Sequence, residues 1–288
     1  MKKIAAILLA VLSVFALTSC RVGDKIKVNF YAPYWNFWKY SSGSEFTYTA
    51  ADIKEIDINW VGGEIEIVSS KNAELTVTEN SEELDEGAKM HYFIKDGKLT
   101  LHYSEAFYKE ETDASHKHVR IEVPEGIEID VDSVTASVKI GEMALGAIKI
   151  TNVSGDVQLA RLAASEVEIE NVDGNIVAGE IVADEFSVES VSGSLTFSGV
   201  SANEIKVNTV SGKTELGVNK RAEVEISSVS GGIELFIPDD IGATVEYSTM
   251  SGHFISEKPH TTSKKTYIFG KGEIHVTVET MSGNLHVS

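Results

Sequence analysis

A four-residue phrase ending in glycine returns at a fixed interval through the second half of the chain. It first reads Asn152-Val153-Ser154-Gly155, and four further copies place their glycines 19 residues apart. Two later copies follow after intervals of 21 and 31 residues, and a degenerate earlier copy ends at Ala136. The repeat glycines are Gly155, Gly174, Gly193, Gly212, Gly231, Gly252 and Gly283. A fixed period near 20 residues is typical of an architecture built from stacked coils.

Apolar and polar residues alternate between one phrase and the next, which predicts strands with one buried face. The apolar columns keep their place from copy to copy, and Thr214 is the one exception in its column. The columns are Val167, Phe186, Ile205 and Val224; Ile169, Val188, Val207 and Ile226; and Val157, Ile176, Leu195, Thr214 and Ile233. Nineteen residues hold two short strands and two turns and leave no room for a helix. The sequence therefore predicts an all-β, single-stranded β-solenoid, a β-helix-like fold with coils of about 19 residues. A right-handed coil is expected from the usual handedness of parallel crossovers.

The residue types of the repeated phrase are those expected at a tight turn between two strands of a coil. Glycine suits a position that needs a positive φ or a close approach of two backbones. The Ser, Thr or Asn residues beside it can hydrogen-bond to the local backbone. One isolated coil cannot offset the conformational entropy of ordering it, so each coil depends on the coils above and below.

The first 20 residues are typical of an exported protein. Met1-Lys2-Lys3 precedes an apolar run from Ile4 to Leu17, which predicts a signal peptide over residues 1–19. The end of this segment, Leu17-Thr18-Ser19-Cys20, resembles a bacterial lipobox, and lipidation of Cys20 is expected. Cys20 is also the one cysteine in the sequence, so no intramolecular disulfide can form. The expected location is extracytoplasmic, with the chain anchored by lipid to the bacterial cell membrane or outer membrane.

The chain is strongly acidic. It carries 25 basic and 44 acidic residues, a net charge of −19, and removal of Lys2 and Lys3 with the signal peptide leaves 23 basic residues and a charge of −21. Phosphate binding requires a basic footprint, so nucleic acid is not an expected partner. Such acidity is compatible with cations or basic partners.

Three parts are expected after the signal peptide. A lipid-anchored tether is predicted over residues 20–44, and segment 31–40 of this tether holds six aromatic residues. These aromatics either sit at the membrane interface or, as we favour, cap the first coil. The solenoid is expected over residues 45–288, with less regular coils over 45–132 and regular repeats over 133–288. Polar loops are expected over residues 80–89, 105–117 and 256–266, where solenoids often carry recognition.

The repeats resemble a known family. The phrases at 153–155, 191–193, 210–212 and 229–231, together with the closing segment from Gly270 to Gly283, are similar to the DUF4097 family of candidate bacterial adhesin domains. The resemblance covers roughly residues 45 to 288. It implies a β-helix-like fold on exported or membrane-anchored proteins, and some relatives are associated with cell-envelope stress systems. The family has no agreed catalytic residues, so the resemblance implies none here.

Two clusters are candidates for cation chemistry. Glu166, Glu185, Glu204 and Glu223 occupy one position in four successive coils, which places their carboxylates about 5 Å apart. Lys206, Arg221, solvent or Ca²⁺ would have to offset their repulsion. The ordinary interpretation is a hydrated column, so no metal site is assigned and the column is kept as a calcium candidate. His116 and His118 lie on one face of an extended segment, but no third ligand is near them in sequence.

No catalytic residues, cofactor or nucleotide motif is expected. The sequence contains no Gly-x-Ser-x-Gly elbow and no phosphate loop. The main hypothesis is a non-catalytic, lipid-anchored envelope protein that acts as an adhesin or scaffold for another protein or a glycan. A second hypothesis is an envelope-stress accessory protein that works through a membrane partner. A third is a β-helix carbohydrate-active enzyme that uses acids such as Asp156 and Asp173.

Overall fold

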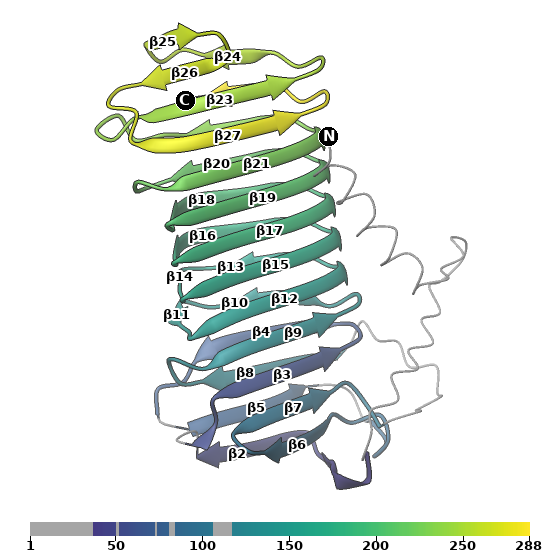
Figure 1. Ribbon diagram of the computed structural model, residues 1–288. Coiled ribbons are helices and arrows are strands. Elements are labelled where there is room, and N and C mark those ends of the chain that lie inside the picture. Colours follow the sequence, from purple (N-terminus) through teal and green to yellow (C-terminus); the bar gives the residue numbers. More distant parts are fainter. Residues whose placement is uncertain (1–36, 50–51, 73, 81–83, 106–116) are drawn as a thin grey trace, which may run out of the picture.

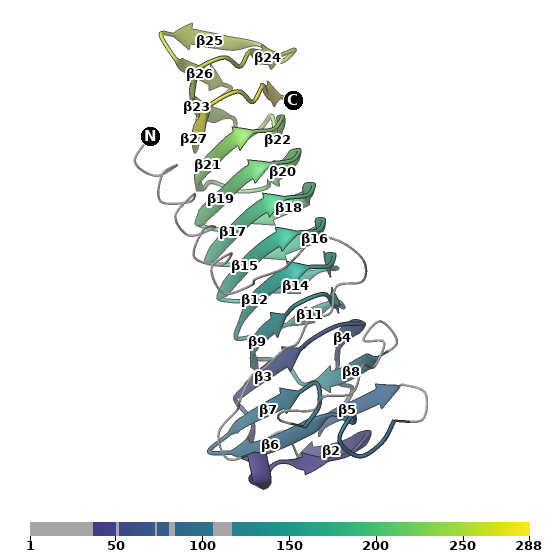
Figure 2. The ribbon, with the colours of Figure 1, turned by 90° about the vertical axis from the view of Figure 1, so that its right-hand side faces the viewer.

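Each regular coil contributes one strand to each of two long sheets that face one another across the core. The computed structural model describes residues 37–49, 52–72, 74–80, 84–105 and 117–288. Figure 1 shows the coils stacked into an elongated column, with sheet A in front and sheet B behind. In Figure 1 the strands of sheet A run to the right and those of sheet B return to the left behind them while the chain climbs, so the solenoid is right-handed. Figure 2 shows the same stack from the side, with the two sheets on either side of the core. The predicted β-solenoid is confirmed.

Sheet A holds the longer strands of the regular coils, and nearly all of its central pairings are parallel. In stacking order its strands are β1 (Ser41–Ser42), β6 (His91–Lys95), β7 (Lys98–His102), β3 (Glu55–Trp60), β9 (Glu128–Ser133), β12 (Ala147–Ser154), β15 (Glu166–Asp173), β17 (Glu185–Ser192), β19 (Glu204–Ser211), β21 (Glu223–Ser230), β27 (Ile274–Thr280), β23 (Ala243–Thr249), β26 (Thr266–Phe269) and β25 (His260–Ser263).

Sheet B stacks in the same manner on the other side of the core. In order its strands are β2 (Glu45–Thr49), β5 (Glu74–Asn80), β8 (His118–Val123), β4 (Glu64–Ser69), β10 (Ser137–Ile140), β13 (Val157–Leu159), β16 (Ile176–Val182), β18 (Leu195–Ser201), β20 (Thr214–Val218), β22 (Ile233–Phe236), β28 (Leu285–Val287) and β24 (Phe254–Ser256), with β11 (Met143–Ala144) and β14 (Leu162–Ala163) beside this path.

The columns predicted from the period are real columns of the stack. Val167 pairs with Phe186, and Phe186 pairs with Ile205, which pairs with Val224. All four side chains are buried, as are those of the other two predicted columns. Thr214, the exception among the apolar residues, is fully buried, and its hydroxyl oxygen has no hydrogen-bond partner. One repeat of the sequence therefore equals one layer of the solenoid.

At the glycine corners, the backbones of neighbouring layers lie too close together to accommodate a Cβ. Gly193 has a φ of 112°, and a Cβ placed on it would lie 2.0 Å from the carbonyl oxygen of Gly174 in the layer below. Asn152 Nδ2 donates to the carbonyl of Gly155 at 3.1 Å, and Ser190 Oγ donates to the carbonyl of Ser192 at 3.2 Å. The predicted corner chemistry is confirmed.

The stacking order departs from the chain order at both ends. β27 pairs with both β21 and β23, so the last coil of the chain lies between two coils that precede it in sequence. Near the other end β3 pairs with both β7 and β9 in the same way. The repeat indicates how many coils form, but it does not indicate which coils become neighbours.

The C-terminal end is closed by a hairpin and a cluster of aromatic rings. We predicted a polar loop over residues 256–266, and this prediction is wrong for most of the segment, because β25 and β26 pair as antiparallel strands at the edge of sheet A. Phe254 stacks on Tyr267 with ring centroids 3.6 Å apart, and His260 packs 5.2 Å from Phe269. These rings cover the open end of the core.

The N-terminal end is closed by antiparallel strands, and Phe46 of β2 stacks on Tyr92 of β6 at 3.9 Å. Tyr40 follows the short helix η1 (Phe37–Lys39) and packs 5.3 Å from Phe93, as expected of a cap residue. Trp38 is instead 68% exposed. The expected signal peptide, Cys20 and the expected tether up to Asn36 lie outside the described residues. No helix in the described ranges is long and apolar enough to span a bilayer.

Candidate functional site

The four predicted glutamates form one column on the outer face of sheet A. Glu166 pairs with Glu185, Glu185 with Glu204, and Glu204 with Glu223. One of the two expected cationic neighbours is present, because the ammonium of Lys206 contacts the carboxylate of Glu204. Arg221 instead lies 3.7 Å from Glu273. In the other direction the same column continues through Ala147 to Glu128 and Glu55.

The column is part of a larger acidic face, and the sequence analysis identified only this one column of it. On the ten strands from β7 to β23, the outward positions of sheet A carry fifteen carboxylates and three lysines. The carboxylates belong to Glu55, Asp57, Glu128, Asp130, Asp132, Glu166, Glu168, Glu170, Glu185, Glu189, Glu204, Glu223, Glu225, Glu246 and Glu279, and the lysines are Lys98, Lys149 and Lys206.

The three lysines neutralise only their immediate neighbours. Lys149 Nζ lies 3.0 Å from Glu168 and 3.1 Å from Glu170. Lys98 Nζ bridges Glu55 at 2.7 Å and Asp57 at 2.6 Å. Glu128, Glu166, Glu185 and Glu223 have no basic side chain within ion-pair distance among the described residues. The face keeps a large negative charge.

Two aspartates on β9 have raised pKa values in this arrangement. Partial burial raises the pKa of Asp130, and the nearby carboxylates of Asp132 and Asp57 raise it further. The pKa of Asp132 is raised by the same causes, burial first and Asp57 second. Both groups therefore hold a proton more tightly than ordinary aspartates, and a cation near them would stabilise their ionised forms.

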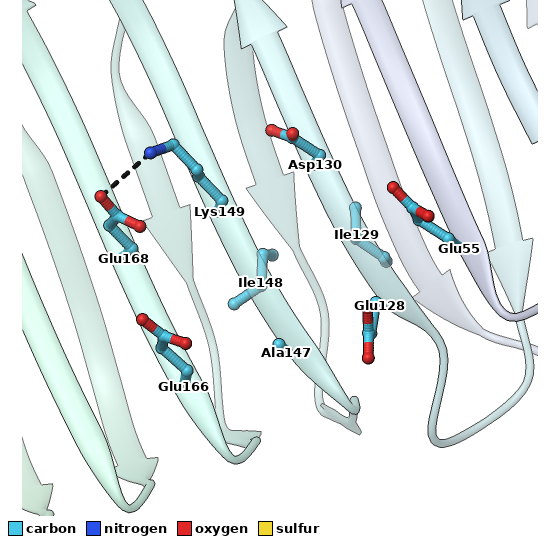
Figure 3. A pocket seen from close by; sticks show the side chains of 9 residues that line it. All are labelled: Glu55, Glu128, Ile129, Asp130, Ala147, Ile148, Lys149, Glu166 and Glu168. Carbon is cyan, nitrogen blue, oxygen red and sulfur yellow. Dashed lines mark hydrogen bonds and ion pairs between the residues drawn. The ribbon is translucent and has the colours of Figure 1, made fainter. Parts of the chain in front are cut away.

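A hollow lies where the glutamate column is interrupted. It has a volume of about 230 Å³ and is lined by Glu55, Glu128, Ile129, Asp130, Ala147, Ile148, Lys149, Glu166 and Glu168. Figure 3 shows Glu128 and Glu166 on either side of Ala147, whose methyl group leaves the space open. The ion pair of Lys149 with Glu168 borders the hollow (Figure 3). Its carboxylate walls suit an ammonium or guanidinium group.

The described residues include no group of three or more His, Cys, Asp or Glu side chains close enough to hold a metal ion. Calcium binding by Glu166, Glu185, Glu204 and Glu223 stays a prediction. Of the predicted histidine pair, His116 lies outside the described residues. His118 Nε2 lies 3.4 Å from Glu64 and 3.5 Å from Glu66 on the outer face of sheet B.

The two aspartates of the enzyme hypothesis accept hydrogen bonds from different residues. Asp156 stands beside Asn175 of the next coil and accepts a hydrogen bond from its backbone N–H at 2.9 Å. Asp173 belongs to a different column and accepts one from Ser192 Oγ at 3.0 Å. Each carboxylate is therefore engaged in its own hydrogen bond to the next coil.

The valine of the repeated phrase was not singled out from the sequence, yet it points to solvent. In β15 the burial alternates, so Val172 lies on the same outer face as Glu166, Glu168 and Glu170. The equivalent residues line one edge of that face. We call them the apolar ridge: Val153, Val172, Val191, Val210, Val229, Met281 and Met250. The signal that could have found the ridge is the alternation itself, carried one residue further into the phrase.

The fold and the repeat together identify the family. Residues 53–288 match the family profile described as Toastrack DUF4097. The chain belongs to the Toastrack DUF4097 family. The resemblance inferred from the repeated phrases is thereby confirmed over most of the chain.

A solved structure with a TM-score above 0.5 shares the architecture. A candidate adhesin from Bacteroides fragilis superposes with a TM-score of 0.52 at 12% identity, covering 85% of this chain and 96% of that one. A candidate adhesin from Parabacteroides distasonis gives 0.46 at 14% identity, with 85% and 96% covered. A candidate lipid-binding protein from the same species gives 0.36 at 12% identity, with 85% and 96% covered. No functionally curated protein is detectably similar to the chain.

Proposed function

We propose that this protein is a non-catalytic, lipid-anchored envelope protein that recognises a partner through the outer face of sheet A. The observation that carries the proposal is the acidic face itself, which runs along the solenoid on ten neighbouring strands. A flat, rigid array of like charges is costly to the fold, because each neighbouring pair of carboxylates repels. A partner that brings positive charge would recover that cost on binding.

Family membership supports the adhesin-like part of the proposal. A structural relative above a TM-score of 0.5 is described as a candidate adhesin. The hydrogen bonds of Asp156 and Asp173 within separate corners give the enzyme hypothesis no support. No observation favours the envelope-stress hypothesis over direct recognition.

The expected anchor fits the orientation of the described chain. Tyr40 fixes the start of the fold at the N-terminal end of the solenoid through its contacts with Phe93 and His102. Sixteen residues separate Cys20 from Phe37, a reach of about 55 Å when fully extended. An anchor at Cys20 would hold the column by this end and leave the acidic face accessible along its length.

Two measurements on the full-length protein test the proposal. Radiolabelled fatty acid should be incorporated into the protein and lost in Cys20→Ala, which should leave the membrane fraction. Lipid incorporation that persists in Cys20→Ala would contradict the anchor. Binding to isolated cell-envelope material should be saturable and should weaken as salt rises, because surface charge interactions are screened. Absence of any saturable binding would contradict recognition.

A further inference from the structure

Burial in the core does not account for the apolar ridge. The corner needs the glycine and the polar residues of the phrase, and the core is filled by the residues that point inward. The motif valines Val153, Val172, Val191, Val210 and Val229 are partly exposed, and none belongs to the core cluster. A polar residue at these positions would satisfy the same strand and turn. The apolar side chains therefore need another explanation.

The ridge is continuous although the chain order is not. In five layers the motif serine donates to the carbonyl of the ridge residue in the layer below, as Ser230 Oγ does to Val210 at 3.5 Å. Ser282 Oγ donates to the carbonyl of Val229 at 3.4 Å, and Ser251 Oγ to that of Met281 at 3.4 Å. Met281 therefore lies between Val229 and Met250, and the exchange of the last two coils leaves the ridge unbroken.

Met250, at the upper end of the ridge, is the most exposed large apolar side chain in the described residues. Met250 is 76% exposed and Met281 is 40% exposed. With layers about 4.8 Å apart, the seven ridge residues span roughly 29 Å. The five valines are partly exposed and the two methionines exposed, and a contiguous accessible apolar strip is a candidate interaction site.

The charge of the residues beside the ridge determines which kind of molecule can bind over it. The nearest column of outward residues on sheet A includes Glu170, Glu189 and Glu279, and the two columns beyond it hold most of the other carboxylates. On the opposite side the ridge meets the corner and its Ser and Gly residues. The surface is therefore apolar along one edge and acidic along the other.

Other occupants fit this surface poorly. Two copies of this face would bring two arrays of carboxylates together, which is unfavourable. An anionic bilayer surface would be repelled by the same carboxylates. A polypeptide with a row of apolar side chains flanked by Lys or Arg would bury the ridge and neutralise the columns at once.

We propose that the apolar ridge and the adjacent acidic columns together form one elongated binding site for a basic, amphipathic polypeptide segment. This inference rests on the proposed function and names the chemistry of its partner. The apolar row of the partner lies along the ridge, and its basic side chains reach Glu170, Glu189 and the carboxylates beyond them.

A designed peptide tests the proposal on the full-length protein. The probe is a 20-residue helical peptide of Leu and Lys with all Leu on one face, about as long as the ridge. Two matched peptides separate the contributions, one of Leu and Glu in the same pattern and one of 20 Lys. We expect the Leu/Lys peptide to bind at least tenfold more tightly than oligolysine, and the Leu/Glu peptide not to bind.

Variants of the protein locate the site. The ridge variant Val172→Ser/Val191→Ser/Val210→Ser should weaken binding of the Leu/Lys peptide at least tenfold. The charge variant Glu170→Gln/Glu189→Gln should weaken it and reduce its salt dependence. The control variant Val177→Ser/Val182→Ser removes two valines of sheet B that are 45% and 42% exposed, and it should bind as the wild type does.

Equal affinity of the ridge variant and the wild type, or equal affinity for oligolysine and the Leu/Lys peptide, would overturn the proposal. Circular dichroism and melting curves of each variant separate a lost site from a lost fold. If envelope binding persists while the Leu/Lys peptide does not bind, the inference fails and the proposed function stands. If neither is seen, both fail.

Discussion

The ammonium of Lys117 lies 2.6 Å from a carboxylate oxygen of Glu79, inside the N-terminal end of the solenoid. Only 3% of the Lys117 side chain is exposed, and the ammonium also donates to the carbonyl oxygens of Ala88, at 2.8 Å, and Tyr103. It lies over the rings of Trp60 and Tyr103. Glu79 in turn accepts the backbone N–H of Met90 at 3.0 Å. The pair ties β5, β8 and the segment before β6 together.

Lys117→Met should therefore destabilise the protein by about 3 kcal/mol, because it leaves the carboxylate of Glu79 buried without its partner. Chemical denaturation would measure the loss. The control is Lys213→Met, which removes an exposed lysine that lies 2.6 Å from Glu215 on sheet B and should change stability little. A Lys117→Met protein as stable as the control would show that the pair does not hold this end.

Gly193→Ala should destabilise the solenoid by about 2 kcal/mol or more, because the new Cβ would meet a backbone carbonyl at a φ that L-residues avoid. Gly232 makes a suitable comparison, since a Cβ there meets nothing within 4 Å. Thermal unfolding of the two alanine variants measures the difference. Equal melting temperatures would contradict the close approach at the corner.

Asp130→Asn should stabilise the protein at pH 7 by roughly 1–2 °C in melting temperature. The raised pKa of Asp130 means that its ionised form is disfavoured in the fold, so the penalty is full above that pKa. The advantage of the variant should shrink as pH falls through the raised pKa and vanish below the ordinary value of 3.8. An advantage that is independent of pH would contradict this origin.

His102 is present in both the wild type and Asp130→Asn, and it makes the stability of each fall as the pH decreases. The effect of Asp130 is therefore seen only in the difference in stability between the two proteins. Burial lowers the pKa of His102 from 6.5 to about 4, and the neighbouring His91 adds to the shift. The stability that depends on its neutral form is complete above pH 6.5 and is lost as pH falls towards 4. The same scan of His102→Gln should show a flatter decline in acid.

Millimolar Ca²⁺ should raise the melting temperature of the wild type if the column of Glu166, Glu185, Glu204 and Glu223 binds it. The rise should be lost in Glu185→Gln/Glu204→Gln, since a hard cation needs several carboxylate oxygens. Magnesium serves as the control for general screening. An unchanged melt at millimolar Ca²⁺ would remove the calcium hypothesis and leave a hydrated column.

The period of the sequence was sufficient to predict the repeating part of the fold. Because one repeat equals one layer, alignment of the copies gave the true register, including the pairing of Glu166 with Glu185. The corner chemistry of Gly155 and Asn152 also followed from residue type. These features are local or repeat in every layer, so the sequence contains them several times.

The ends of the solenoid and the full extent of the acidic face could not be predicted without the structure. Nothing in the spacing shows that β27 lies between β21 and β23, because strand pairing is decided by which edges remain free. Lys117 lies in a polar stretch of sequence, and only the closure of the N-terminal end buries it. The ridge was missed because the phrase containing Val172 was interpreted only as a turn.

The most direct test of the account measures binding to isolated cell-envelope material with one face altered at a time. The sheet A variant is Glu166→Gln/Glu185→Gln/Glu223→Gln, and the sheet B control is Glu180→Gln/Glu215→Gln/Glu234→Gln, which removes the same number of charges. Recognition through sheet A predicts at least a tenfold loss of affinity for the first variant and wild-type binding for the second. Equal losses in the two variants, or no loss in either, would contradict the central role of the acidic face.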